Sequence, residues 1–152
     1  MVDSRDKGAR AETVIRDVLR DLTGLKWERV PGSGALDPKH GLKGDLYVPG
    51  KNCLYCVECK HYAEDQLSTK LLTSKSPILL DWWDQTLRQA RQINKKPLLI
   101  FKHDRSKLFC AFEDFPYGDY MHLYVHYLES HPFYIALLED YIKEDKPRFV
   151  DE

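Results

Sequence analysis

The stretch "GDLYVPGKNCLYCVECK", residues 44–60, decides how the centre of this chain folds. "DLYV", then "PGKN", then "CLYCVECK" is a pattern typical of a strand, a turn and a second strand. The stretch also contains two chemical signals, one made of cysteines and one made of charged residues. The geometry of the second strand favours one of them.

Strand alternation separates the three cysteines of this stretch. In a strand over residues 53–60, Cys53 and Cys59 point to one face and Cys56 points to the other, so the three thiols cannot surround one tetrahedral zinc ion. Cys53 and Cys59 themselves would lie about 20 Å apart, at roughly 3.3 Å per residue. We therefore expect buried thiols, and a zinc knuckle with His61 as fourth ligand only if the segment is not a strand.

The same alternation gathers the charged residues. Glu58 and Lys60 stand two positions apart and share a face, and Asp45 approaches them from the partner strand. Carboxylates are hard oxygen ligands for Mg²⁺, which lowers the pKa of a bound water and stabilises the charge that develops during phosphodiester hydrolysis. A nearby ammonium can orient that water. Charged pairs are common on strands, so these three residues alone are weak evidence for a catalytic site. The helices and strands expected around them strengthen it.

The flanking segments predict an α/β architecture. Residues 6–23 have the apolar periodicity of an amphipathic helix that ends at Gly24, and Glu12 falls at the edge of its apolar stripe. "LKWERV" alternates like a short strand. A second helix is expected over residues 77–94, with Ser76 as its N-cap, followed by the strands "PLLIFK" and "KLFCAF". This order predicts a mixed five-stranded sheet flanked by helices.

The remaining segments are less regular. "PGSGALDPKHGLKG", before the hairpin, has the glycine and proline content of a loop. Near the C-terminus "YMHLYVHYL" is compatible with a helix or a strand, and a helix is expected from residues 130–132 to about Lys143. We expect a single domain over residues 1–152, with its core at about residues 6–112 and an aromatic and acidic C-terminal extension at residues 113–152.

Charge is distributed unevenly along the chain. The formal net charge is -1, but residues 1–107 contain 20 Lys and Arg against 14 Asp and Glu, whereas residues 108–152 contain 3 against 10. The first part therefore permits phosphate binding. No apolar run of about 18 residues exists and the N-terminus is highly charged, so we expect a soluble, intracellular protein with no membrane partner.

Aromatic residues are concentrated in the acidic part. Of the 18 Phe, Trp and Tyr side chains, 10 lie between Phe109 and Tyr141. This density fits either an oligomer interface or additional core, and the sequence leaves both open.

The residues around the expected hairpin resemble a known nuclease motif. The motif is that of the PD-(D/E)xK superfamily, and the matching residues are Glu12, Gly44-Asp45 and Glu58-Cys59-Lys60. The superfamily has a restriction-endonuclease-like core with the α-β-β-β-α-β order expected above. "PGSG" and the sequence of the second helix are similar to the Holliday junction resolvases of archaea and their phage relatives. The resemblance covers about residues 7–112.

The resemblance implies a role for each matching residue. Asp45 and Glu58 are implied to be metal ligands, together with the backbone carbonyl of Cys59. Lys60 is implied to position the attacking water, and Glu12 to hold a metal or its water. The implied cofactor is Mg²⁺, with Mn²⁺ able to substitute.

Other residues are candidates for DNA contacts. The resemblance implies that Ser33 lies near the scissile phosphate and that Gln85, on the second helix, faces the site. Gly44 replaces the proline of the superfamily name, and the resemblance implies that this is tolerated because only the aspartate binds metal. The basic candidates for phosphate contacts, all close to the expected site in sequence, are Lys7, Arg10, Arg29, Lys39, His40, Lys43 and His61.

These observations predict a Mg²⁺-dependent, structure-selective DNA endonuclease. We expect a homodimer that resolves four-way junctions in recombination and repair, in the cytoplasm, which is that of the host if a phage encodes it. A restriction-like or repair nuclease for linear or damaged DNA is an alternative. A non-catalytic DNA-binding module and a zinc-binding module are further alternatives.

Overall fold

The protein, seen in a computed structural model, is described over residues 4–31, 43–127 and 131–151, with side chains from residue 8 onward. Ser33, Lys39 and His40 lie outside the described residues, as does the side chain of Lys7. The helices are α1 (Ser4–Thr23), α2 (Lys70–Thr73), α3 (Ile78–Gln92), α4 (Leu138–Asp140) and the π-helical turn η2 (Tyr141–Asp145). The strands are β1 (Glu28–Arg29), β2 (Leu46–Tyr47), β3 (Asn52–Cys53), β4 (Tyr55–Tyr62), β5 (Lys96–His103), β6 (Phe109–Phe112), β7 (Leu123–Val125), β8 (Phe133–Leu137) and β9 (Val150–Asp151).

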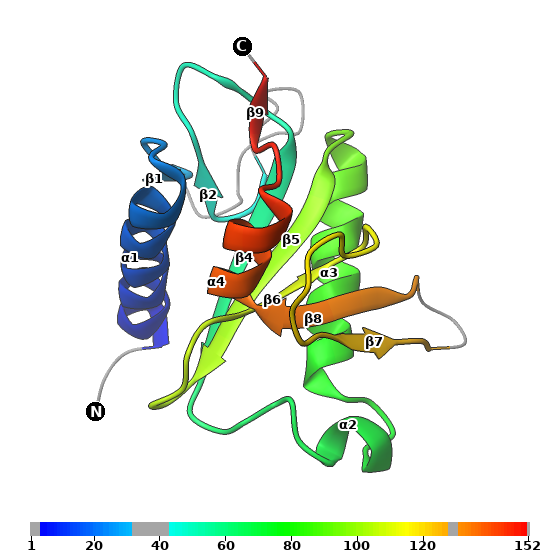
Figure 1. Ribbon diagram of the computed structural model, residues 1–152. Helices are drawn as coiled ribbons and strands as arrows, with labels where there is room; N and C mark the ends of the chain where they lie inside the picture. Colours follow the sequence, from blue (N-terminus) through cyan, green and yellow to red (C-terminus); the bar gives the residue numbers. More distant parts are fainter. Residues whose placement is uncertain (1–3, 32–42, 128–130, 152) are drawn as a thin grey trace.

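The strands form one large mixed sheet and one small sheet (Figure 1). The large sheet has seven strands in the order β1-β2-β4-β5-β6-β8-β7, and the small sheet pairs β3 with β9. β4 and β5 are parallel, because α3 connects them as a crossover, while the other neighbours are antiparallel. The expected α/β fold with a mixed sheet is confirmed, with two more strands in the large sheet than the sequence predicts.

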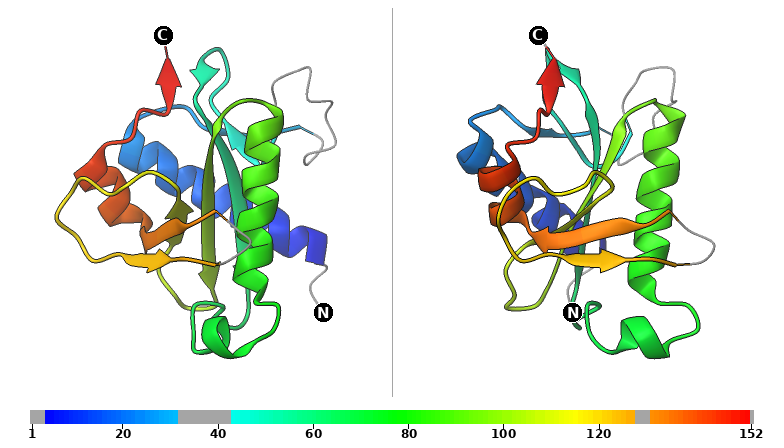
Figure 2. Two further views of the ribbon diagram at one scale, coloured as in Figure 1. Left: turned by 90° about the vertical axis from the view of Figure 1, so that its right-hand side faces the viewer. Right: turned by 45° about the vertical axis from the view of Figure 1, so that its right-hand side comes forward.

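Helices cover both faces of the sheet (Figure 2). α1 packs on one face together with α4 and η2, and α3 packs on the other. Each face has its own hydrophobic cluster, one around Ile15, Leu19 and Trp27 and the other around Trp82 and Trp83. Among the described residues, no helix is both long and apolar enough to cross a membrane.

Both long helices follow their apolar periodicity with small differences. α1 buries Ala11, Ile15 and Leu19 as expected, whereas Val14 remains exposed. α3 begins at Ile78, one residue later than predicted, and Ser76 provides no side-chain cap. The boundaries of both helices therefore agree with the sequence to within about one turn.

The central hairpin confirms the predicted alternation. Tyr55, Val57 and Cys59 of β4 join the hydrophobic cluster under α1, while Tyr62 packs against Trp82 of α3 on the opposite face. The predicted strand over residues 53–60 is interrupted at Leu54, because β3 leaves the large sheet to pair with β9. The C-terminal end of the chain thus holds the turn of the hairpin.

The C-terminal segment differs most from the sequence prediction. The helix expected from residues 130–132 to about Lys143 is wrong in its first half, because β8 occupies Phe133–Leu137 and pairs with β6. Phe133 and Ile135 face the α3 cluster, which is the period-two pattern of a strand. Helical structure begins only at Leu138. The extension therefore completes the sheet.

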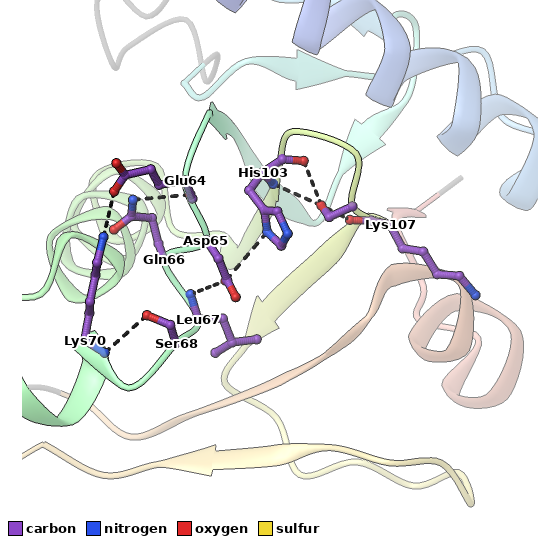
Figure 3. A network of polar contacts seen from close by, with 9 residues as sticks. Glu64, Asp65, Gln66, Leu67, Ser68, Lys70, His103 and Lys107 are labelled. Atoms are coloured by element: carbon purple, nitrogen blue, oxygen red, sulfur yellow. Dashed lines mark hydrogen bonds and ion pairs between the residues drawn. The ribbon is translucent and has the colours of Figure 1, made fainter.

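The segment that follows β4 is fixed by polar contacts (Figure 3). Asp65 accepts a hydrogen bond from the backbone N–H of Leu67 (2.8 Å) and lies 3.6 Å from Nδ1 of His103 at the end of β5. Lys70 pairs with Glu64 (2.7 Å). These contacts bind the chain between β4 and α3 to the end of the parallel strand pair.

Candidate active site

Asp45 occupies the point where the β2–β4 ladder ends. In the described part of the chain, β2 and β4 pair at Leu46 and Val57. The backbone N–H of Asp45 donates to the carbonyl of Val57 (2.7 Å), and Oδ2 of Asp45 accepts a hydrogen bond from the backbone N–H of Cys59 (2.8 Å). The Asp45 carboxylate therefore accepts the hydrogen bond that a backbone carbonyl of the neighbouring strand would otherwise accept from Cys59. This bond fixes the carboxylate beside β4.

Gly44 makes this arrangement possible. Its φ is +82°, and a Cβ at this position would lie 2.6 Å from the carbonyl oxygen of Val57 and 3.1 Å from Sγ of Cys56. A side chain here would collide with the backbone of β4. Glycine is required where the superfamily name has proline, whose ring fixes φ near −65°.

We expect Gly44→Ala to destabilise the fold and displace Asp45. The left-handed φ costs an alanine about 1–2 kcal/mol, and the contact with Val57 adds to that cost. Gly50→Ala is a matched control, since Gly50 has φ +76° and nothing within 4 Å of its Cβ position. Chemical denaturation should show a larger loss for Gly44→Ala than for Gly50→Ala. Equal losses would mean that the close approach is unimportant.

Glu58 and Lys60 lie on the α3 side of β4. Glu58 is buried and receives a hydrogen bond from the side chain of Gln89. Burial raises the pKa of Glu58, and the charge of the half-buried Lys60 partly offsets that rise. Oε1 of Gln89 is buried and accepts no hydrogen bond from the described residues. The sequence predicted Gln85 on this helix, and the structure instead brings Gln89, one turn further along, to the carboxylate.

Glu12 reaches the cluster from α1. Its side chain is 13% exposed, hydrogen-bonds to Asp45 and pairs with Arg29 at 3.2 Å. Its expected place at the edge of the apolar stripe is confirmed. Arg29, predicted to contact phosphate, holds this carboxylate.

The three carboxyl groups form a hydrogen-bonded series from Glu12 through Asp45 to Glu58. Burial, and then the neighbouring Asp45, raise the pKa of Glu12 to about 7. Burial, and then the charge of Glu58, raise the pKa of Asp45 to about 7. Burial also raises the pKa of Glu58. Carboxylates this close to one another favour either a retained proton or a bound cation.

The donor set fits a magnesium-like ion. Among the described residues no three His, Cys, Asp or Glu side chains are arranged to hold a metal together. Mg²⁺, however, is usually bound through one or two carboxylates, with water completing an octahedron. Asp45 and Glu58 supply two carboxylates from neighbouring positions and match that requirement.

The other predicted DNA contacts are scattered. Arg10 is exposed on α1, and Lys43 lies near Cys56, where its charge acts on the thiol. His61 pairs with Asp104 (2.7 Å) and faces away from Lys60, because it is the next residue along β4. His61 is therefore not brought to the carboxylate cluster.

The cysteines are buried, as expected. Cys53, Cys59 and Cys110 lie in the cluster under α1, and Cys56 lies on the opposite face beneath Gly44. Burial raises the pKa of Cys56 to about 12. Within the described residues the thiols thus form no common metal site.

Sequence comparison places the chain among phage nucleases. A model of the family described as "Phage putative PDDEXK endonuclease" matches residues 3–143. Protein D14 of Escherichia phage T5 is 50% identical over 115 residues, which are 74% of this chain and 72% of that protein. The solved structure of Hjc, described as a Holliday junction resolvase from Archaeoglobus fulgidus, matches over 91% of this chain and 89% of that chain, with a TM-score of 0.40 and 15% identity. On the evidence of the family model and the T5 protein, the chain belongs to the phage PDDEXK endonuclease family.

Proposed function

We propose that this endonuclease is metal-dependent and cuts branched DNA, with four-way junctions as its substrate. The observation that carries the proposal is the series of carboxyl groups from Glu12 to Glu58 beside Lys60. Three acidic groups in hydrogen-bonded contact at the end of a ladder destabilise the fold unless something compensates their charge. Divalent cation binding explains why they are there.

Each residue of the cluster has a distinct task in this proposal. Asp45, Glu58 and the carbonyl of Cys59 would hold Mg²⁺, or Mn²⁺ in its place. The bound ion would supply Lewis-acid stabilisation of the phosphate and lower the pKa of a bound water. Lys60 would orient the attacking water, and Glu12 would hold a second ion or a water.

Two neighbours support these groups. Arg29 keeps Glu12 directed toward Asp45, and Gln89 keeps Glu58 in place from α3. Such outer contacts are needed because a small displacement of a reacting group greatly lowers the rate. Ser33 and Gln85 remain candidates for contacts near the scissile phosphate.

Charge supports DNA as the substrate. The part of the chain that contributes the cluster, residues 1–107, is the basic part. Lys7, Arg10, Lys39, His40 and Lys43 remain candidates for phosphate contacts there, and affinity should fall steeply with salt. The acidic remainder would face away from the DNA.

The choice of a junction rests on the resemblance of the motif and of "PGSG" to the junction resolvases. Resolution requires two incisions related by symmetry, and one chain offers one carboxylate cluster. A twofold dimer supplies two clusters to a substrate that itself has near-twofold symmetry. The dimer is therefore part of the proposal.

A direct competition experiment tests this function. Purified protein is incubated with an immobile four-way junction, a linear duplex of equal length and single-stranded DNA, with Mg²⁺ or with EDTA. We expect paired incisions in the junction, little cleavage of the other DNAs and none in EDTA. Equal cleavage of the linear duplex would favour the restriction-like or repair alternative. Cleavage in EDTA would refute the proposed dependence on a metal ion.

A further inference from the structure

The edge of the sheet farthest from the carboxylate cluster has an unusual composition. β7 is the terminal strand there and hydrogen-bonds only to β8 among the described strands. Residues 121–127, "MHLYVHY", contain no Lys, Arg, Asp or Glu. Exposed edge strands normally carry charges that prevent pairing with another chain. The opposite edge follows that rule, since β1 consists of Glu28 and Arg29.

The β7 edge also exposes large apolar side chains. Leu123 is 52% exposed, Tyr124 57% and Met121 88%. Met121, His122 and Leu123 also line a hollow of about 180 Å³, together with apolar residues of β6, β8 and the segment before α2. Most of the exposed large hydrophobic residues of the described chain lie in this region, and they are Phe115, Tyr117, Met121, Leu123, Tyr124 and Tyr127.

On the face of the sheet that carries α4, β7 and β8 present a continuous aromatic surface. Tyr134 contacts the rings of Tyr124 (5.2 Å between centroids), Phe115 (5.8 Å) and His122 (5.8 Å). Tyr124 in turn stacks on His126 (6.4 Å). Aromatic residues are enriched at protein interfaces, where a rigid ring buries much area at small entropic cost.

The lack of charged residues at this edge disfavours DNA and suits contact with an identical chain. Residues 108–142 contain no Lys or Arg, which are the side chains that usually neutralise DNA phosphates. In a twofold contact, the residues at the axis meet their own copies, and any charge there would face a like charge. A strand without charges avoids that repulsion.

We propose that the β7 edge and its aromatic surface form the contact between two copies of this chain, with β7 pairing antiparallel to β7 of the second copy. The inference deepens the proposed function, which requires two clusters, and names the surface that joins them. It leaves both clusters open, since Asp45 and Glu58 lie at the other side of the sheet. Pairing would satisfy the outer backbone groups of β7.

The oligomeric mass tests the contact without any measurement of cleavage. Light scattering coupled to size exclusion should give twice the chain mass of 17.8 kDa for the wild type. Tyr124→Lys, alone and with Leu123→Lys, should give the monomer mass, since two lysines would meet at the axis. Val14→Lys is the matched control, because Val14 is 51% exposed on α1, and it should remain a dimer.

A cross-link gives an independent result. All four native cysteines are buried, so a cysteine introduced at the edge would be the reactive one. Under oxidation, Tyr124→Cys should form a disulfide dimer, because the residue at the axis opposes its own copy and opposed strand residues lie within about 5.5 Å. Val14→Cys should not.

Three outcomes would overturn the proposal. A monomeric wild type refutes it, as does a dimer that survives the lysine substitutions. A monomer whose affinity for single-stranded oligonucleotides falls in Tyr124→Ala would mean that the aromatic surface stacks bases instead. A dimer that cuts nothing would refute the proposed function and leave this interface standing.

Discussion

Asp45→Asn should abolish cleavage, lowering the single-turnover rate by roughly 10³-fold or more. The amide oxygen can still accept the hydrogen bond from Cys59, so the ladder end and the fold should persist. The substitution removes the negative charge that a divalent cation requires. The measurement is cleavage of a labelled junction at saturating enzyme, with binding followed separately by gel shift.

Glu58→Gln and Lys60→Ala should also abolish cleavage while leaving DNA binding largely intact, as should Asp45→Asn. Asp17→Asn is the control, since Asp17 lies on α1 with a side chain that is more than half exposed. It should cleave like the wild type. Rapid cleavage by Asp45→Asn would place the reacting centre elsewhere.

The metal-free protein should become less stable as the pH rises from about 5 to 8. The pKa values of Glu12 and Asp45 are raised to about 7 in the folded state, from 4.5 and 3.8. Between about pH 4 and pH 7 the folded state therefore binds more protons than the unfolded state. The resulting stabilisation is complete below about pH 4 and is lost as the pH rises through 7, by about 1.4 kcal/mol per pH unit for each retained proton.

Denaturation in EDTA across this pH range measures the effect. Asp45→Asn should reduce the slope and raise the stability at pH 8, because a buried charge is removed, whereas Asp17→Asn should keep the wild-type slope. Mg²⁺ should stabilise the wild type more at pH 8 than at pH 6, since ligands must lose their protons to bind it. A stability that is flat or rises with pH in EDTA, and equal in Asp45→Asn, would contradict the assigned series of carboxyl groups.

Local periodicity in the sequence determined the parts of the site that lie within one element or one hairpin. A strand alternates every two residues, so Glu58 and Lys60 had to share a face, and the cysteines had to separate. A helix repeats every 3.6 residues, which placed Glu12 at the margin of α1. Asp45 followed from its position in the hairpin. These relations depend only on backbone geometry and survive any tertiary arrangement.

Contacts between distant elements were decided by the tertiary structure alone. Gln85 and Gln89 share a helical face, and only the way α3 crosses β4 selects Gln89 for the contact with Glu58. The pairing of His61 with Asp104 depends on the turn after β5. β8 has residues compatible with a helix, but pairing with β6 and burial of Phe133 and Ile135 make it a strand. Strand pairing and helix packing bring together residues that are far apart in the chain. Local periodicity in the sequence does not predict which of these residues will be in contact.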